Sequence, residues 1–445
     1  MSRSWNAAFA AYLDRRVLMV VLVGFSSGLP LALTYSTLSA WLAGEGISRT
    51  TIGLLALVGT SYNLKFLWSP LIDRMPLPLL TRLLGRRRSW GLLIQALLMV
   101  AILALGASDP VHHIAVTATL AVVVAFLSAS QDIVLDAYRV ELLDEDQQGP
   151  GAGAVQAGYR LAMLASGAGA MLVAGRFGWF TAYATMAALV GLGMAVLLLG
   201  PEPKIRLSPA TAQREIMAAR YLANRPHLRG RAAQVLAWLH GAVVCPFADF
   251  MARPVWWAVL LFIIGYKMGE AMAGAMANPL YIDLGFKLDE IAYVSKVFGF
   301  AATMAGIILG GALVARLGVM RALLVFGVLQ SLGNLAYVLQ AMAGHDLGAL
   351  ALCVFTENLT AGMAASALVT YLSEQCNLAY TATQYALLSS LTALGRTVFA
   401  SGSGWLADRL GWVDFFLLTT IVTLPALLLL PWLMRQQGRV APKPS

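Results

Sequence analysis

The sequence predicts an all-α polytopic membrane protein with twelve transmembrane helices in two halves of six. The first observation is composition: 59% of the 445 residues are hydrophobic and only 12% are charged, about half the charged fraction of a soluble chain. The second is that long apolar stretches recur along the whole chain. The third is that most Lys and Arg residues lie between these stretches. Lipid is therefore the expected solvent of most of the surface.

The expected spans follow one another in chain order, separated mostly by short loops. A helix needs about 20 apolar residues to cross about 30 Å of hydrocarbon. The segments that meet this requirement are 17–42, 51–73, 89–107, 113–137, 151–175, 179–200, 255–282, 289–315, 320–343, 347–373, 381–407 and 412–434. The longer ones can tilt or project beyond the bilayer.

The largest break between spans is 201–254, which divides them six and six. We interpret it as a cytoplasmic or interfacial linker between an N-terminal bundle, 1–200, and a C-terminal bundle with a short tail, 255–445. Within the linker, 211–224 is expected to form an amphipathic helix on the membrane surface. The run 232–248 is short and contains Pro246, so we expect it at the interface.

The basic residues predict the orientation. If the N-terminus is cytoplasmic, the periplasmic loops hold only four of the 31 Lys and Arg residues, namely Arg49, Arg176, Lys287 and Arg409. Cytoplasmic loops of membrane proteins carry such an excess of Lys and Arg, so both termini are expected in the cytoplasm. The net charge of +9 follows from these loops, and no nucleic-acid partner is expected.

A faint internal repeat supports two related halves. Residues 165–169 read ASGAG and are followed by RFGW at 176–179, while residues 400–404 read ASGSG and are followed by RLGW at 409–412. These segments belong to the fifth span of each half. A two-fold arrangement of six and six spans is common among secondary transporters.

Several enzyme classes lack their motifs in this sequence. We find no GxxxxGK[ST] phosphate loop, no HExxH metal motif and no GxSxG elbow in a strand–turn–helix setting. The three cysteines, Cys245, Cys353 and Cys376, show neither CxxC pairing nor metal-ligand spacing. A secondary transporter is therefore favoured over an ATP-driven pump or an enzyme, and no metal site is expected.

Ionisable residues inside the spans are the candidate functional residues, because a charge in the bilayer is costly unless it is paired or wet. Asp132 and Asp136 are spaced i, i+4 and share one helix face. Like charges so close together favour retention of a proton by one of them, as proton coupling requires. The alternative is a structural cytoplasmic lock in which the two acids pair with Arg139 and Arg160.

Two further acids lie in the second half. Lys267 and Glu270 are spaced i, i+3, so they form either a self-neutralising pair or a pair of which one member meets substrate or proton. We expect them at the wall of a central cavity. Glu357, beside Asn358 and midway across its span, is a proton-carrier candidate or else an ion-pair partner of Arg396 or Lys267.

The cations inside the spans outnumber the carboxylates available near them, which suggests an anionic substrate. The substrate-binding candidates are these cations, together with Gln131 beside Asp132 and the aromatic Tyr62; the cations are Lys65, Arg160, Lys267, Lys296 and Arg396.

The loop after the second span holds Asp73-Arg74 and later Gly85-Arg86-Arg87-Arg88. It looks like a stretched form of the Asp-Arg…Gly-Arg-Arg motif of the major facilitator superfamily. The matching loop of the second half has Arg316 but Ala315 in place of the acid. Such a loop pairs charge with a helix end and stabilises one conformer; the gating candidates are Asp73, Arg74, Arg86, Arg139 and Arg316.

Several segments together resemble the AmpG-type muropeptide permeases of the major facilitator superfamily. They are GFSSGLPLALTYSTLSAWL (24–42), LKFLWSPLIDR (64–74), SASQDIVLDAYRVELL (128–143), YKMGEAMAGAMANPLYIDLGF (266–286) and TATQYALLSSLTALGRT (381–397). The superfamily resemblance implies alternating access around a central cavity between two six-helix halves.

The family resemblance implies a substrate and a driving force. It implies import of the anionic sugar peptides GlcNAc-1,6-anhydroMurNAc-peptides across the bacterial inner membrane, by a monomer in symport with protons and without another cofactor. That import serves cell-wall recycling and β-lactamase induction. A carrier of another anionic solute, such as a coenzyme A ester, and a non-transporting membrane receptor or sensor are the alternatives.

Overall fold

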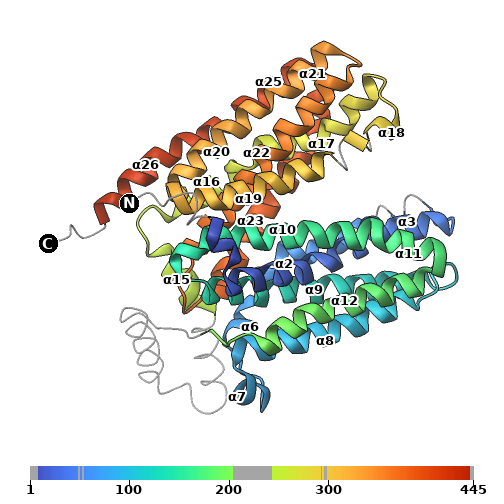
Figure 1. The fold of residues 1–445 in the computed structure, drawn as a ribbon, viewed down its shortest axis with the longest axis vertical. Helices are drawn as coiled ribbons and strands as arrows, with labels where there is room; N and C mark the ends of the chain where they lie inside the picture. Colours follow the sequence, from blue (N-terminus) through green and yellow to red (C-terminus); the bar gives the residue numbers. More distant parts are fainter. Residues whose placement is uncertain are drawn as a thin grey trace, which may run out of the picture.

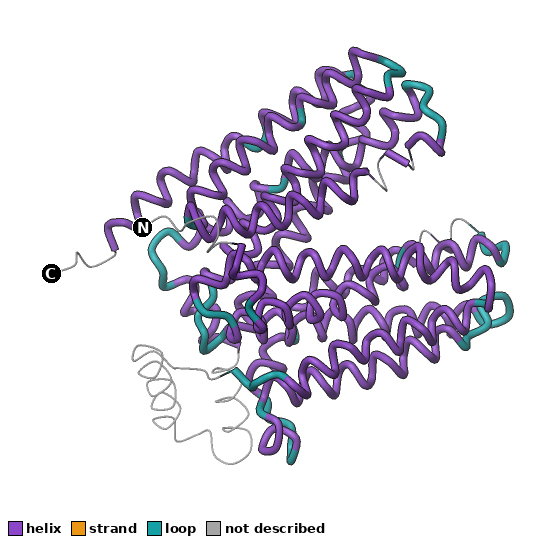
Figure 2. Tube along the Cα trace, in the orientation of Figure 1, coloured by secondary structure: helices purple, strands orange, loops and turns teal. Residues whose placement is uncertain are grey.

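The computed structural model describes residues 9–48, 51–52, 55–203, 243–291, 293–294 and 298–440. These residues form helices joined by short connections, and the described part contains no strand (Figure 2). The all-α class is confirmed. Three sequence interpretations fall on residues outside the described ones: the amphipathic helix at 211–224, most of the run 232–248, and Lys296.

The first half contains six helical passes, several of them interrupted. After η1 (Ala11–Leu13), their segments are α2 (Arg15–Thr34) with α3 (Ser36–Gly44); η2 (Ala56–Gly59), α5 (Thr60–Leu64), η3 (Lys65–Leu67) and α6 (Ser69–Arg74); α7 (Leu80–Leu84) and α8 (Arg86–Gly106); α9 (Ile114–Leu142); η4 (Glu145–Gln147), α10 (Gln148–Leu164), η5 (Ala165–Gly169) and α11 (Ala170–Phe177); and α12 (Trp179–Leu199).

The second half repeats this pattern of six passes. Its segments are α15 (Cys245–Met251), which lies within the predicted linker; α16 (Trp256–Tyr266) with α17 (Met268–Asp283); α18 (Leu288–Ile291) and α19 (Gly299–Leu317); α20 (Val319–Gly333) with α21 (Leu335–Ala343); α22 (Leu347–Glu374); α23 (Thr381–Ser401) with α24 (Ser403–Leu410); and α25 (Trp412–Ile421) with α26 (Leu424–Val440).

Ten helices of the described residues are long and apolar enough to cross a membrane. The other two expected spans, 51–73 and 381–407, are helical but fall outside this set for different reasons. The first is divided into short 3₁₀ and α segments, so no single helix reaches the needed length. The second carries Ser, Thr and Arg side chains along α23, which lower its hydropathy. Both contribute residues to the cavity described below.

The internal repeat of the sequence reappears as a repeated turn. Gly178 separates α11 from α12 with φ 82° and ψ 164°, and Gly411 separates α24 from α25 with φ 77° and ψ 166°. A positive φ of this kind favours glycine, which has no Cβ to clash. The same local sequence therefore makes the same sharp turn after the fifth span of each half.

The helices form two bundles that meet at one end and diverge at the other (Figure 1). The first bundle holds α2 to α12 and the second α16 to α26. Both described chain ends lie near the end where the bundles meet, which we call the closed end; α3 and α11 on one bundle and α18 and α21 on the other mark the open end. Helix α10 packs against α19 and α22, and α23 packs against α5, α6 and α9.

Close backbone contact and apolar packing hold the closed end together. A Cβ at Gly153 would lie 3.0 Å from the Ile307 carbonyl oxygen, which is a tight contact, so the absence of a side chain favours this close approach of α10 to α19. The hydroxyl of Tyr12 donates to the Ile308 carbonyl at 2.9 Å. Ala382 and Ala386 of α23 belong to a buried apolar cluster made otherwise of first-half residues. These contacts join the two bundles at the closed end, and the bundles diverge toward the other end.

Candidate functional site

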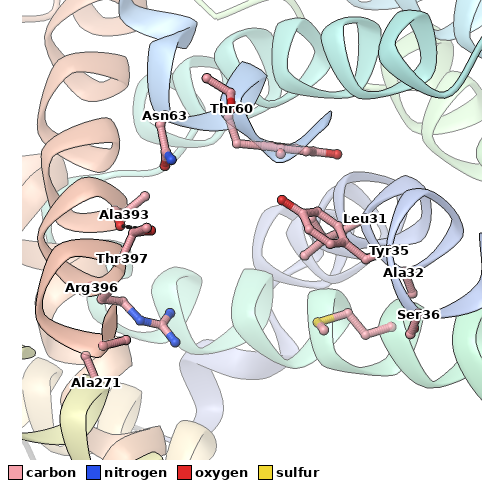
Figure 3. Close-up of a pocket in the computed structure, with 14 residues that line it drawn as sticks. Leu31, Ala32, Tyr35, Ser36, Thr60, Asn63, Ala271, Ala393, Arg396 and Thr397 are labelled. Carbon is pink, nitrogen blue, oxygen red and sulfur yellow. Dashed lines mark hydrogen bonds between the residues drawn. The ribbon is translucent and has the colours of Figure 1, made fainter. Parts of the chain in front are cut away.

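Two adjoining chambers lie between the bundles, with Ala393 and Arg396 in the lining of both. The outer chamber has a volume of about 730 Å³. It is lined by residues of α2 and α3, of the segments η2 and α5, and of α23, with one residue each from α10 and α17; these are Leu31, Ala32, Tyr35, Ser36, Gly59, Thr60, Tyr62, Asn63, Met163, Ala271, Ala393, Arg396, Thr397 and Ala400. Figure 3 shows Arg396 and Thr397 facing Tyr35 across this space, with Asn63 and Thr60 on a third side.

The inner chamber has a volume of about 280 Å³ and holds most of the charge. Ala393 and Arg396 line both chambers, so the two spaces adjoin along α23. The polar and charged residues of the inner chamber are Ser27, Asp132, Asp136, Gln156, Tyr159, Arg160, Lys267, Glu270, Tyr385, Ser389, Thr392 and Arg396.

The i, i+4 acids of α9 both line the inner chamber, as their shared helix face predicts. Asp132 is nearly buried, at 9% exposure, and accepts a hydrogen bond from the Ser27 hydroxyl. Asp136 forms an ion pair with the buried Lys65, with 3.7 Å between Nζ and Oδ2. Within the described residues neither acid forms an ion pair with Arg139 or Arg160, so the expected partners of the lock are wrong.

Lys267 occupies the break between α16 and α17, and it forms a direct ion pair with Glu270 in the first turn of α17. Glu270 also accepts a hydrogen bond from the Gln330 amide, and Lys267 contacts the Ala361 carbonyl at 3.3 Å. Both side chains line the inner chamber, the position expected for them. The pair is self-neutralising in this conformation, and its atoms remain accessible from the cavity.

Two cations of the cavity have no acidic partner among the residues that the structure describes. Arg160 and Arg396 both line the inner chamber with exposed side chains, and neither guanidinium forms an ion pair or hydrogen bond within the described part of the chain. Of the expected cations, Arg160, Lys267 and Arg396 thus converge on one cavity. Lys65 does not line the cavity, but it forms an ion pair with Asp136, which does.

Three other expected residues occupy different positions. Glu357 is half-buried but does not line either chamber, and its carboxylate has no ion pair with Arg396 or Lys267 among the described contacts. Gln131 is fully buried and donates to the Ser26 carbonyl at 2.9 Å, so it fastens α9 to α2 inside the first bundle. Tyr62 does line the outer chamber.

A network of charges lies at the closed end, around Asp73. The Asp73 carboxylate accepts a hydrogen bond from Arg87 Nη2 at 2.7 Å. Its other oxygen accepts from the backbone N–H and the hydroxyl of Thr383, at 3.2 and 3.0 Å. Thr383 lies in the first turn of α23, where unsatisfied N–H groups and the helix dipole favour a negative charge. Asp73 therefore joins the first bundle to the second.

Arg87, and not Arg86, is the arginine that makes this contact, which corrects the sequence expectation. Arg87 is only 1% exposed and also pairs with Glu141 at 2.5 Å. Helix α8 begins at Arg86 and turns the next side chain toward the bundle. In a run of three arginines the phase of the helix selects the buried one, and sequence alone does not set that phase.

The remaining gating candidates also lie near the closed end. Arg74 stacks on the Tyr380 ring at 4.9 Å. Arg139 is fully buried, donates to the Ser373 hydroxyl at 3.0 Å and lies 5.4 Å from the Tyr385 ring centroid. Both therefore bridge the two bundles. Arg316 lies in the last turn of α19.

Each described end of the linker region is attached to this network. Glu202 accepts hydrogen bonds from the backbone N–H groups of Arg87 and Arg88, at 2.8 and 3.1 Å, and so caps α8. Asp249 of α15 accepts from the Gln384 amide at 3.0 Å. Because Gln384 follows Thr383 in α23, the two ends of the linker region contact the two sides of the closed end.

Sequence reasoning missed Arg87, Tyr35, Asn63, Thr383 and Glu202. Arg87 was visible as part of an arginine run, and Thr383 as part of a polar stretch inside a span. Tyr35 and Asn63 carried no signal, because neutral polar residues are common in spans and only the fold shows which of them face a cavity. Within the described residues, no group of three or more His, Cys, Asp and Glu side chains is placed to hold a metal ion.

A membrane-spanning fold with a charged cavity between two bundles, closed at one end, defines a membrane transporter. Comparison with solved structures bears on the fold alone. The fold is similar to that of the fucose:proton symporter of E. coli, with a TM-score of 0.65 at 11% identity over 97% of this chain and 99% of that one. It is also similar to a proton:xylose symporter, with a TM-score of 0.63 at 12% identity over 96% of each chain.

Sequence comparison is more specific. The family model described as Major Facilitator Superfamily matches residues 20–400 and 259–445. The anhydromuropeptide permease of Escherichia coli K12 is 41% identical over 93% of this chain and 79% of its own length. A protein of Rickettsia felis named putative transporter AmpG 4 is 33% identical over 95% and 97%. The chain therefore belongs to the AmpG-type muropeptide permeases of the major facilitator superfamily.

Proposed function

We propose that the chain imports anhydromuropeptides, GlcNAc-1,6-anhydroMurNAc and its peptides, from periplasm to cytoplasm in symport with protons. The observation that carries this proposal is a pair of guanidinium groups, Arg160 and Arg396, that have no partner among the described residues and line a cavity inside the membrane. Uncompensated cations in such a site are costly unless a ligand neutralises them. The carboxylates of a muropeptide peptide supply that charge, and the E. coli relative named above is an anhydromuropeptide permease.

The direction of import follows from the proposed orientation. The distribution of Lys and Arg favours cytoplasmic termini, and both described chain ends lie at the closed end. In that orientation the outer chamber faces the periplasm of the bacterial inner membrane, so this conformation is ready to accept solute. Rocking of the two bundles about the cavity would then expose the solute to the cytoplasm. The protein acts as a monomer and needs no cofactor other than protons.

Asp132 is the acid that best suits proton coupling. Asp136 and Glu270 each have an ion pair, so protonation of either would leave a cation without its partner. Asp132 has only the Ser27 hydroxyl as a partner and makes no ion pair within the described residues. It can therefore gain and lose a proton while the neighbouring pairs stay intact. The imported solute would supply cell-wall recycling and the induction of β-lactamase.

Uptake into proteoliposomes tests the proposal. Purified protein is reconstituted, and accumulation of labelled GlcNAc-1,6-anhydroMurNAc-tripeptide is measured with and without an inward proton gradient. We expect accumulation above equilibrium only with the gradient, and collapse when a protonophore is added. Equal uptake in both conditions would contradict proton coupling. No uptake by a folded protein, as judged by thermal unfolding, would contradict the substrate.

A further inference from the structure

The two chambers differ sharply in charge. The described residues that line the inner chamber include six Asp, Glu, Lys and Arg side chains, namely Asp132, Asp136, Arg160, Lys267, Glu270 and Arg396. The outer chamber is more than twice as large, but among the described residues that line it Arg396 is the only Asp, Glu, Lys or Arg, and it stands at the junction of the two spaces. A ligand in the cavity therefore meets neutral groups at one end and charged groups at the other.

The outer chamber offers neutral hydrogen-bonding groups that are free to bind a ligand. The side chains of Tyr35, Ser36, Thr60 and Asn63 form no hydrogen bond with other described residues. They come from two different passes and approach the same space, with Tyr35 and Asn63 on separate walls (Figure 3). Hydroxyl and amide groups that both donate and accept, next to an aromatic ring, suit the hydroxyl and acetamido groups of sugars.

The sequence places Tyr35 in this wall through two local features. Tyr35 occupies the break between α2 and α3, with φ −116° and ψ −94°. Its hydroxyl comes so close to Gly59 that a Cβ at that position would lie 1.3 Å from the oxygen. Any side chain at position 59 must therefore displace the tyrosine. The outer chamber depends on a glycine far from Tyr35 in sequence.

The inner chamber is suited to carboxylates. One of its cations, Lys267, is neutralised by Glu270, and Lys65, which does not line the chamber, is neutralised by Asp136. Arg160 and Arg396 remain, and a guanidinium binds a carboxylate through two parallel N–H donors. The volume of about 280 Å³ is below the range of about 300–1,000 Å³ of sites that enclose a whole small molecule. This chamber therefore fits a part of a ligand.

We propose that the two chambers are separate subsites for the two chemical parts of one ligand. The sugar rings occupy the outer chamber, among Tyr35, Thr60 and Asn63, and the carboxylates of the peptide extend into the inner chamber to Arg160 and Arg396. This orientation rests on the proposed function, because it presumes a ligand that joins sugars to an acidic peptide. It assigns sugar recognition to the first half and peptide recognition to the junction of the two halves.

Equilibrium binding to the purified, full-length protein in nanodiscs tests the orientation. The two ligands are the disaccharide tripeptide and the peptide-free disaccharide with its lactyl carboxyl amidated. We expect Arg160→Gln to lower the affinity for the tripeptide ligand by about tenfold or more, which corresponds to the loss of one charge-assisted contact. The affinity for the peptide-free ligand should fall by less than about twofold. In each of the variants Asn63→Ala and Gly59→Ala, the affinities for the two ligands should fall by the same factor.

Arg176→Gln, an exposed substitution at the end of α11, is the matched control and should change neither affinity. Amidation of the peptide carboxylates tests the contact in the wild-type protein, without any effect on folding. The loss of binding free energy caused by amidation and the loss caused by Arg160→Gln should not be additive, because both changes remove the same contact.

Equal weakening of both ligands by Arg160→Gln, or full additivity of the two losses, would overturn the orientation while leaving the proposed function intact. Failure of the wild-type protein to bind either ligand would overturn the proposed function itself.

Discussion

At the scale of single residues, the ionisable groups in and near the cavity are of two kinds. Engaged groups form an ion pair, and free groups form none with the described residues. Asp136 and Glu270 are engaged by Lys65 and Lys267. Asp132, Arg160 and Arg396 line the same space without an ion pair among the described contacts. An engaged group lost by mutation leaves its partner unpaired inside the membrane, whereas a free group lost by mutation removes only what it binds. The two kinds of residue should therefore behave differently when they are substituted.

The two acids of α9 test this difference. We expect Asp132→Asn to abolish proton-driven accumulation in proteoliposomes while ligand binding and exchange between loaded vesicles persist. Asp136→Asn should instead lower stability, by up to about 3 kcal/mol, because Lys65 is left buried without its partner. Thermal unfolding and uptake are measured on both proteins. If both variants accumulate solute as the wild type does, the acid pair has no part in coupling.

The free and engaged cations form a second matched pair. Arg396→Ala should reduce uptake of a carboxylate-bearing muropeptide more than uptake of its amidated analogue, because attraction in a partly dry cavity is weakly screened. Lys65→Ala should reduce both equally, through the loss of its pair with Asp136. The quantity to compare is the ratio of the two uptake rates in each variant. An unchanged ratio for Arg396→Ala would show that this arginine does not interact with the carboxylates of the ligand.

At the scale of elements, α23 connects the cavity to the closed end. Its first turn holds the Asp73 carboxylate through Thr383, and its later turns line both chambers through Ala393 and Arg396. The low hydropathy of this helix follows from that position, because the faces that meet the cavity are polar. A tilt of α23 changes the chamber walls and the Asp73 contact together, so this helix is suited to couple binding to opening of the closed end.

Neighbouring arginines in α8 test the role of the closed end. Arg87→Gln leaves Asp73 and Glu141 without their shared cation, and the loss of a partner from a buried ion network costs about 3–5 kcal/mol. We expect the Arg87→Gln variant to have a lower unfolding temperature than the wild type. We also expect a lower rate of uptake, because the contacts that stabilise the closed end are weakened. Arg86→Gln, one residue earlier, lies outside the network and should change both by little. Equal behaviour of the two variants would contradict the assignment of Arg87.

At the scale of the whole molecule, two bundles that meet at one end and diverge at the other have a cavity between them. Small residues such as Gly153 allow backbone contact at the closed end, while the bundles diverge toward the outer chamber. The apolar surfaces of both bundles remain exposed on their outer faces, where lipid covers them. The charged groups inside the membrane are therefore removed from lipid by the arrangement of the bundles.

Thiol labelling of intact cells tests the orientation of this cavity. In a background with Cys245, Cys353 and Cys376 replaced by Ser, a membrane-impermeant maleimide should modify Ala400→Cys in the outer chamber. Ala382→Cys, buried in the apolar cluster of the closed end, should stay unmodified until the protein is unfolded. Added muropeptide should slow the reaction at position 400. Modification of Ala400→Cys only in inside-out vesicles would reverse the proposed orientation.

The sequence by itself determined the fold class and most of the spans, because the requirement for apolar residues in lipid acts on each helix separately. Asp132 with Asp136, and Lys267 with Glu270, could also be placed on common faces from their spacing along one helix. The family followed from motifs that lie along the chain. Each of these inferences depends on local sequence only.

Only the tertiary structure decided which groups meet across helices. Asp136 pairs with Lys65, which lies 71 positions earlier, and Asp73 accepts from Thr383, 310 positions later. Arg87 was distinguished from Arg86 by the phase of one helix, and Tyr35 was brought against Gly59 by a break in another. Such contacts depend on the packing of helices from distant parts of the chain, and the hydrophobic pattern that places a helix in the membrane does not set its neighbours.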